Sequence, residues 1–440
     1  MPVLRAAELS RNLARLSQLG GVFRPSIRVR PLTGEAKFNI RLVDVGRCGA
    51  TSPLHAGPQN ARTRGIITVG TSVHDDEAML LAHVEGLERY STCVFHDHQF
   101  VVASANELGA DAIALDSLPQ CSATELAHPK CRTVAPQKNV AIRWVRGWSI
   151  FDARVVHIPA ALVYLNVPLA TPEHLALPIT TGCAAYTSYE GALLRGLLEV
   201  IERDALTLVW LQRLQLPRIN VDVVPKELAT AWDQYQRASP DLECLFFDAT
   251  TDVGVCTVYA LQIAHRDSRV RTLVGCATDL TAGKAIAKTI RDLTHIRTAL
   301  RHERSIPSNW GDFADVLDGA TYMARARQAA AFDFLTQAPH RRLLSSMILD
   351  GDLNDQDALA MVLTRLRRLG CDVYVVDLTT DEARRCGINV VRVIIPALQP
   401  LSFSYHTRYL AHPRLYEAPP RMGHRAASEG NLNRYPQPFA

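Results

Sequence analysis

The spacing of hydrophobic positions changes repeatedly along the chain between the period of a helix and the period of a strand. Helical spacing predicts helices over residues 75–91, 189–211, 282–300 and 355–369, with a shorter one near Asp381. Short apolar runs predict strands over residues 38–43, 65–70, 141–144, 155–165, 243–248, 255–263, 272–276, 371–376 and 390–395. Helices and strands that alternate in this way are typical of an α/β protein.

The two ends of the chain have patterns of their own. Residues 1–21 contain leucines at helical spacing and several arginines, and they lack the continuous apolar core of a secretion signal. Residues 104–140 are rich in loop formers, and the last twenty residues, rich in Pro, Arg and Asn, are expected to be extended. We therefore expect an N-terminal segment over residues 1–60 and one main domain over residues 61–440.

Two of the predicted helices carry the same acidic motif, Glu-x-x-Glu-Arg. Its copies consist of Glu85, Glu88 and Arg89, and of Glu199, Glu202 and Arg203. Each copy follows a strand end or turn that contains glycine, and a weaker third copy has Gly275 at a strand end and Asp292 on the next helix. The chain therefore predicts internally repeated strand-helix units.

The spacing of the glutamates suggests a chemistry. Carboxylates three residues apart lie on one helical face, where like charges repel by about 0.2–0.5 kcal/mol unless a cation lies between them. Mg²⁺ prefers oxygen ligands and commonly takes one or two carboxylates plus phosphate oxygens, and an adjacent Arg can bind phosphate. The residues around Glu199 and Glu202 are mostly apolar, so these acids are expected to need buried partners. The alternative is that both motifs lie by chance on solvated surfaces.

Composition excludes several classes of protein. The chain has 440 residues, of which 48% are hydrophobic and 21% charged, as in globular proteins. Its net charge of +4 is too small to indicate nucleic-acid binding. The longest run without Asp, Glu, Lys or Arg, 155–172, contains three prolines and is a poor membrane span. The ten cysteines form no Cys-x-x-Cys pair, which favours reduced thiols in a cytoplasmic protein.

Several segments resemble the YcaO family. Residues 82–91 are similar to its Ser-x-x-Glu-x-x-Glu-Arg motif, with Ala82 in place of Ser, and residues 191–205 closely resemble its second acidic helix. Residues 181–185 resemble its small-residue nucleotide loop, and residues 373–379 and 391–396 its C-terminal β-α-β segment. The resemblance covers about residues 60–440. It implies an α/β, YcaO-type fold of mixed sheets, with repeated strand-helix units around an ATP site that is not a P-loop.

The resemblance also implies the ligands of that site. Its metal-binding residues for Mg²⁺ would be Glu85, Glu88, Glu199 and Glu202. Its ATP-binding residues would be Gly70, Thr71, Glu85, Arg89, Thr181, Gly182, Cys183, Ala184, Arg203, Lys288, Asp292 and His295. The last three replace the Arg, Glu and Gln of the family's third motif, and the residues after Gly70 lack the expected lysine. These departures bear on ATP affinity.

Members that this chain resembles form azolines. In them a Cys, Ser or Thr side chain of a ribosomal precursor peptide adds to the preceding carbonyl, and ATP phosphorylates the resulting oxygen, which then leaves as phosphate. They typically end in Pro-x-Pro-x-Pro, and this chain ends with Pro436, Pro438 and Ala440, so two of the three prolines match. Because proline stiffens the tail, these residues are the expected catalytic group, with the terminal carboxylate aimed into the site. An ordinary disordered terminus is the alternative.

Other functions stay open at this point. On the same scaffold, an external sulfide or amine would give a thioamide or an amidine. The departures at Thr71, Asp292 and His295 would also suit a nucleotide-binding scaffold subunit without turnover. Cys183 could be a nucleophile, although packing of a small residue is favoured. His96 and His98 could share a metal in a hydrolase, but no nearby residue completes a ligand set.

The expected partners follow from the same resemblance. They are a ribosomally made precursor peptide, typical of bacteriocin and thiazole- or oxazole-modified peptide biosynthesis, and a separate protein that binds its leader. The residues before position 60 are too few for the fused peptide-clamping region of some relatives. Neither nucleic acid nor membrane is expected as a partner, and a homodimer is allowed.

Overall fold

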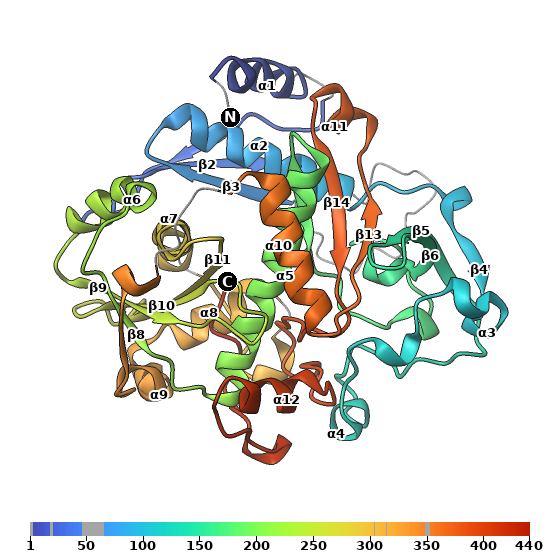
Figure 1. Cartoon of the computed structure of the whole chain (residues 1–440). Helices are drawn as coiled ribbons and strands as arrows, with labels where there is room; N and C mark the ends of the chain where they lie inside the picture. Colours follow the sequence, from blue (N-terminus) through green and yellow to red (C-terminus); the bar gives the residue numbers. More distant parts are fainter. Residues whose placement is uncertain (1–2, 18–20, 46–65, 303, 314, 348–352) are drawn as a thin grey trace.

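The protein is an α/β structure in which three sheets surround a central buried helix (Figure 1). The computed structural model describes residues 3–17, 21–45, 66–302, 304–313, 315–347 and 353–440. Leu19, Cys48, Gly65 and the predicted boundary at residue 60 lie outside the described residues. The predicted fold class is confirmed, and the division at residue 60 stays a prediction.

The helices follow the predicted pattern where that pattern is strong. They are α1 (Val3–Arg15), α2 (Asp75–Ser91), α3 (Ala105–Leu108), α4 (Ala123–Leu126), α5 (Tyr189–Gln212), α6 (Lys226–Gln236), α7 (Ala282–Arg301), α8 (Val316–Met323), α9 (Asp333–Thr336), α10 (Asp355–Arg368), α11 (Asp381–Arg385) and α12 (Arg414–Arg421). Ser188 caps α5, because its hydroxyl accepts a hydrogen bond from the Gly191 amide (3.2 Å). Three acidic residues occupy the first turn of α2, where the helix dipole favours them.

The strands form three sheets. The first contains β1 (Ile27–Val29), β2 (Asn39–Asp44) and β3 (Ile67–Ser72) in that order. The second has the order β11 (Thr272–Thr278), β10 (Thr257–Ala264), β9 (Leu242–Asp248), β8 (Arg218–Asn220) and β12 (Arg341–Leu343). The third has the order β4 (Val101–Ala103), β5 (Ile142–Ser149), β13 (Tyr374–Asp377), β14 (Asn389–Ile394) and β7 (Cys183–Tyr186), with β6 (Arg154–Pro159) beside β5. The second sheet is mixed, because β8 and β12 pair in parallel and its other strands pair antiparallel. The strand pairs of the first and third sheets are antiparallel.

Some elements differ from the expectation. The strand expected over residues 155–165 ends at Pro159, which cannot donate to a strand ladder. Helices α6, α8 and α12 were not predicted. The apolar signal of α6 is weak because its only buried residues are Leu228 and Ala231, and α12 contains two prolines, at 419 and 420.

Helix α5 places the functional residues between the second and third sheets. It contacts β11 on one side and β14 and β7 on the other, and it is buried along most of its length. In Figure 1 it runs through the middle of the molecule, beside the C-terminus. A helix that is apolar on all faces belongs in a core, so the acidic residues in it must find partners there.

Two further expectations concern thiols and membranes. The nine described cysteines are free, and seven of them are buried. Among the described residues, no helix is long and apolar enough to cross a membrane.

Candidate active site

Helix α2 presents the first acidic motif beside the end of strand β3. Oε2 of Glu85 accepts a hydrogen bond from the Val69 amide (3.0 Å), and Oε1 accepts one from Nη2 of Arg89 (3.2 Å). The strand can pass this close to the helix because residue 70 is glycine. A Cβ atom there would lie 1.8 Å from the carbonyl oxygen of Ala78. Packing of the strand against the helix therefore requires glycine here, and the nucleotide contact of Gly70 stays a prediction.

Helix α5 repeats this arrangement with the second motif. Oε2 of Glu199 accepts from the Gly182 amide (3.0 Å), and Oε1 accepts from Nη2 of Arg203 (3.2 Å). Gly182 has a φ of +84°, and a Cβ atom there would lie 2.2 Å from the carbonyl oxygen of Val393. The two motifs thus use the same pair of contacts, one from a preceding amide and one from the arginine four residues later. This is the repeated unit that the sequence indicated.

The two acidic helices act on one another electrostatically. Burial raises the pKa of Glu88 well above its ordinary value, and the negative charges of Glu199 and Glu85 raise it further. Burial would lower the pKa of Arg89, but Glu85, Glu88 and Glu199 more than offset it, so that pKa is raised. Carboxylates from α2 and α5 therefore share one field whose negative charge favours a cation.

Glu202 differs from Glu85 and Glu199 because it pairs with two cationic side chains, one of them from another helix. Its side chain is 2% exposed, and its oxygens lie 2.8 Å from Nζ of Lys288, 3.0 Å from the Thr278 amide and 3.1 Å from Nη1 of Arg203. Burial opposes its ionisation, but Lys288 and Arg203 more than offset burial and hold its pKa below the ordinary value. Glu202 is therefore a charged anchor for the lysine and the arginine.

Helix α7 contributes the third set of predicted residues. Burial opposes the charge of Lys288, yet Glu202 and Asp292 raise the lysine pKa above its ordinary value. Nδ1 of His295 lies 3.1 Å from the hydroxyl oxygen of Thr71, so α7 is joined to β3. The structure thus brings all three positions of the altered third motif to the same region as the acidic helices.

The loop that precedes β7 is held by a residue that the sequence reasoning missed. Arg392 of β14 donates to the carbonyl oxygens of Leu162 (3.0 Å) and Ile179 (2.9 Å), and its Nη1 lies 3.1 Å from Sγ of Cys183. Burial raises the pKa of the Cys183 thiol to about 11, which favours packing over a nucleophilic role. An arginine inside an apolar strand is the signal that could have identified Arg392.

The C-terminal tail reaches the second motif. The ring of Phe439 lies 4.6 Å from Cζ of Arg203, a cation–π distance. Upstream, Nε1 of Trp210 donates to the carbonyl oxygen of Tyr435 (3.3 Å), so the tail follows α5. Ala440 packs against a hydrophobic cluster that includes residues of α7. The tail is therefore an ordered part of the site region.

The exposed histidines lie elsewhere. His96 precedes the short 3-10 turn Asp97–Gln99 and His98 lies within it, and their rings stack at a centroid distance of 5.4 Å. No three His, Cys, Asp or Glu side chains of the described residues are grouped closely enough to hold a metal alone. A cation at the acidic helices would therefore need further oxygens from a ligand, which is how Mg²⁺ binds nucleotides.

The residues at this place fit a magnesium nucleotide. Within the part of the chain that the structure describes, Glu85 and Glu199 form ion pairs only with arginines on their own helices. Among the described residues, Nη1 of Arg203 is buried, pairs with the Glu202 carboxylate at 3.1 Å and makes no hydrogen bond of good geometry. The site thus offers carboxylates for a cation and a guanidinium for an anion side by side.

Comparison with known proteins supports this reading. A family model described as "YcaO cyclodehydratase, ATP- and Mg²⁺-binding" matches residues 69–399. An uncharacterised protein of Methanothermobacter thermautotrophicus is 27% identical over 348 residues, which are 76% of this chain and 82% of the relative.

Three solved structures share the fold. A heterocyclase in complex with substrate and cofactor has a TM-score of 0.77 and 21% identity over 98% of this chain and 57% of its own. The chain thus spans little more than half of that heterocyclase. YcaO from Methanopyrus kandleri bound with AMPPCP and Mg²⁺ has a TM-score of 0.63 and 17% identity, covering 90% of this chain and 91% of its own. The E. coli microcin synthetase McbBCD complex has a TM-score of 0.62 and 13% identity, covering 94% and 96%.

The family match covers most of the chain and includes both acidic motifs, the nucleotide loop and α7. ATP and Mg²⁺ are the cofactors in its description, in agreement with the expectation from the sequence. The protein belongs to the YcaO family.

Proposed function

We propose that this chain is an ATP- and Mg²⁺-dependent cyclodehydratase that acts on backbone amides of a ribosomal precursor peptide in the cytoplasm. It would convert Cys, Ser or Thr residues to thiazolines or oxazolines. The observation that carries the proposal is geometric: Glu85 and Glu199, on separate helices, each accept one hydrogen bond from a preceding amide and one from the arginine four residues later. Reduced thiols in the described residues agree with the compartment.

The described side chains have distinct roles in this proposal. When bound, ATP supplies the phosphoryl group that makes the amide oxygen a leaving group, and Mg²⁺ neutralises its phosphates. Glu85, Glu88, Glu199 and Glu202 provide the carboxylates of the metal site. Arg89 and Arg203 neutralise phosphate charge, which is the main contribution a protein makes to phosphoryl transfer. The amide of Val69 within β3 and the amide of Gly182 before β7 keep Glu85 and Glu199 in position.

The tail has a role in proton transfer under this proposal. Pro436 and Pro438 restrict its backbone, and the contact of Phe439 with Arg203 holds its end beside the second motif. The terminal carboxylate of Ala440 would accept the proton of the attacking thiol or hydroxyl. A carboxylate in that role must lie within hydrogen-bond reach of the substrate.

The partner in this proposal is a separate protein that binds the leader of the peptide. The E. coli microcin synthetase, whose fold this chain shares, is solved as the McbBCD complex. That assembly favours assistance from another chain. Full-rate peptide modification by the purified chain alone would contradict this part of the proposal.

One experiment separates this function from its alternatives. The chain, its partner and the precursor peptide from the neighbouring gene are incubated with ATP and Mg²⁺, and the peptide is weighed by mass spectrometry. Loss of one water per modified residue is the expected result. Exchange of oxygen for sulfur would instead assign thioamide formation, which the incomplete proline motif of the tail allows. Absence of peptide-dependent ATP consumption would assign a scaffold subunit.

A further inference from the structure

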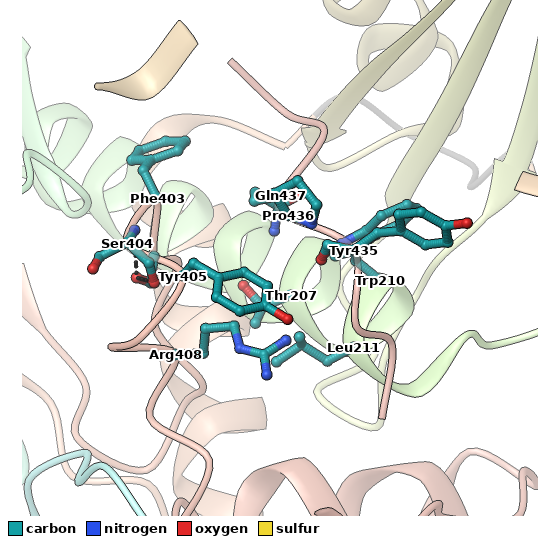
Figure 2. A pocket seen from close by; sticks show the side chains of 11 residues that line it. Thr207, Trp210, Leu211, Phe403, Ser404, Tyr405, Arg408, Tyr435, Pro436 and Gln437 are labelled. Atoms are coloured by element: carbon teal, nitrogen blue, oxygen red, sulfur yellow. Dashed lines mark hydrogen bonds between the residues drawn. The ribbon is translucent and has the colours of Figure 1, made fainter. Parts of the chain in front are cut away.

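The end of the tail, residues 435–440, is in contact with both α5 and α8. Figure 2 shows Tyr435, Pro436 and Gln437 beside α5, and Nε1 of Trp210 in that helix donates to the carbonyl oxygen of Tyr435 (3.3 Å). Phe439 is 7% exposed, and its amide donates to Oε1 of Gln437 (3.4 Å). The tail is therefore ordered on both sides of Gln437.

The contact with α8 is made by Gly319. A Cβ atom at this position would lie 2.2 Å from the carbonyl oxygen of Gln437 and 3.2 Å from the carbonyl carbon of the same residue. A carbon atom and a carbonyl oxygen in contact are usually about 3.3–3.6 Å apart, so a side chain here would force a shift of about 1 Å. The backbone of the tail therefore occupies the space that a side chain of α8 would fill.

Glycine is otherwise unfavourable at this place. Gly319 lies in the middle of α8 (Val316–Met323), where alanine would be the better helix former. Its φ lies outside the left-handed region, so the conformation of the backbone does not require glycine. The close approach of a second backbone is the reason that remains.

Helix α8 is anchored more firmly than the tail. Oδ1 of Asp315 accepts from the Leu317 amide (3.0 Å) and caps the helix. Arg304 pairs with Asp315 (2.9 Å) and with the buried Asp318 (3.1 Å), and the helix packs on β11 and α7. Residues 432–440 belong to no helix or strand. A side chain at position 319 would therefore displace the tail rather than the helix.

We propose that Gly319 is a positioning residue for the C-terminal carboxylate, and that α8 is the support that aims the tail at the second acidic motif. The inference rests on the proposed function and adds the residue that sets the place of its proton acceptor. Ala440 lies three residues beyond Gln437, and the restricted backbone of Pro438 between them leaves little freedom to absorb a shift. A misplacement of about 1 Å can lower the rate of a reaction about 100-fold.

Kinetics and thermal melts of the full chain test this role together. Peptide modification by Gly319→Ala and by the wild type is measured with the partner, ATP and Mg²⁺ present. Gly430→Ala is the matched control, because Gly430 lies in the turn Glu429–Asn431 that precedes the tail and an added Cβ there has no atom within 4 Å. Each substitution is also made in a chain shortened to end at Pro436, which lacks the contact at Gln437.

In the full chain, Gly319→Ala should lower kcat about 100-fold and leave KM for ATP near the wild-type value. In the shortened chain it should not change kcat, because the group through which it acts is gone. There it should raise the melting temperature, since alanine is the better helix former, whereas in the full chain it should lower that temperature, because the added side chain meets the tail. Gly430→Ala should leave kcat unchanged in both chains.

A wild-type kcat in Gly319→Ala would overturn the inference. So would the same fold loss of kcat in the full and shortened chains, or a change of melting temperature with the same sign and size in both. If the shortened chain turns over too slowly to measure, the melting temperatures decide. Absence of peptide modification by the wild-type chain would instead count against the proposed function, and the melting temperatures would still show whether the tail lies on Gly319.

Discussion

Replacement of Gly182 by alanine tests how the nucleotide loop holds the second acidic motif. Gly182 has a φ of +84°, and an added Cβ would lie 2.2 Å from the carbonyl oxygen of Val393. The loop must therefore move, which breaks the hydrogen bond from its amide to Glu199 (3.0 Å). A matched control is Gly370→Ala, because Gly370 has a φ of +75° but no atom within 4 Å of an added Cβ.

The free energies of unfolding of the two variants should differ by the contribution of the hydrogen bond that only Gly182→Ala loses. The left-handed backbone costs an L-residue about 1–2 kcal/mol, which is the whole expected loss for Gly370→Ala. Gly182→Ala should lose a further ~1.5–3 kcal/mol for a hydrogen bond to a charged acceptor. The total expected loss is about 2.5–5 kcal/mol, before any strain from the overlap.

Urea denaturation measures both losses as shifts of the midpoint at equal slope. Isothermal titration with a non-hydrolysable ATP analogue and Mg²⁺ measures the functional effect. Only Gly182→Ala should weaken nucleotide binding, since only that glycine contacts a predicted metal ligand. If Gly182→Ala destabilises the chain no more than Gly370→Ala, or binds nucleotide like the wild type, the loop does not position Glu199.

Three further outcomes are expected from buried ionisable groups. Arg414→Met should lower the unfolding free energy by about 3–5 kcal/mol, because it leaves the fully buried Asp204 unpaired; an unchanged urea midpoint would contradict this. Burial raises the pKa of the Cys183 thiol to about 11, so this thiol should react with iodoacetamide at neutral pH more slowly than the half-buried Cys131. Peptide mapping measures both labelling rates, and equal rates would refute the prediction. The pKa of Glu88 lies above its ordinary value of 4.5 in the folded chain, so without metal the unfolding free energy should fall as pH rises from 4.5 through the folded pKa. Glu88→Gln should remove that part of the pH dependence, and an unchanged profile in urea titrations would argue against it.

Local signals were sufficient to predict much of the fold. The acidic first turn of α2 and the Ser188 cap of α5 define where those helices begin, and long apolar periods define their length. Helix α12 was missed because Pro419 and Pro420 disfavour a helix in the local sequence. Tertiary contacts stabilise the helix in spite of these prolines. Arg414 of that helix pairs with the buried Asp204, an interaction between residues 210 positions apart.

The candidate site shows the same division. Spacing placed each glutamate pair on one face of a helix, but the partition of roles within a pair depends on three-dimensional neighbours. Glu202 accepts hydrogen bonds from Lys288 and the Thr278 amide, which belong to other elements. Burial and the negative charge of Glu199 instead raise the pKa of Glu88. Nothing in the local sequence distinguishes these two environments. The resemblance to a family, rather than periodicity, identified the residues of α7.

The central claim is that α2 and α5 bind one magnesium nucleotide together. Isothermal titration of the ATP analogue with Mg²⁺ to Glu85→Gln, Glu199→Gln, the double variant and Glu190→Gln, an exposed residue in the first turn of α5, tests it directly. We expect each single change to weaken Mg²⁺-dependent binding about tenfold or more, Glu190→Gln to have no effect, and the double variant to lose less than the sum. Wild-type affinity in Glu85→Gln and Glu199→Gln, or strictly additive losses in the double variant, would contradict the claim.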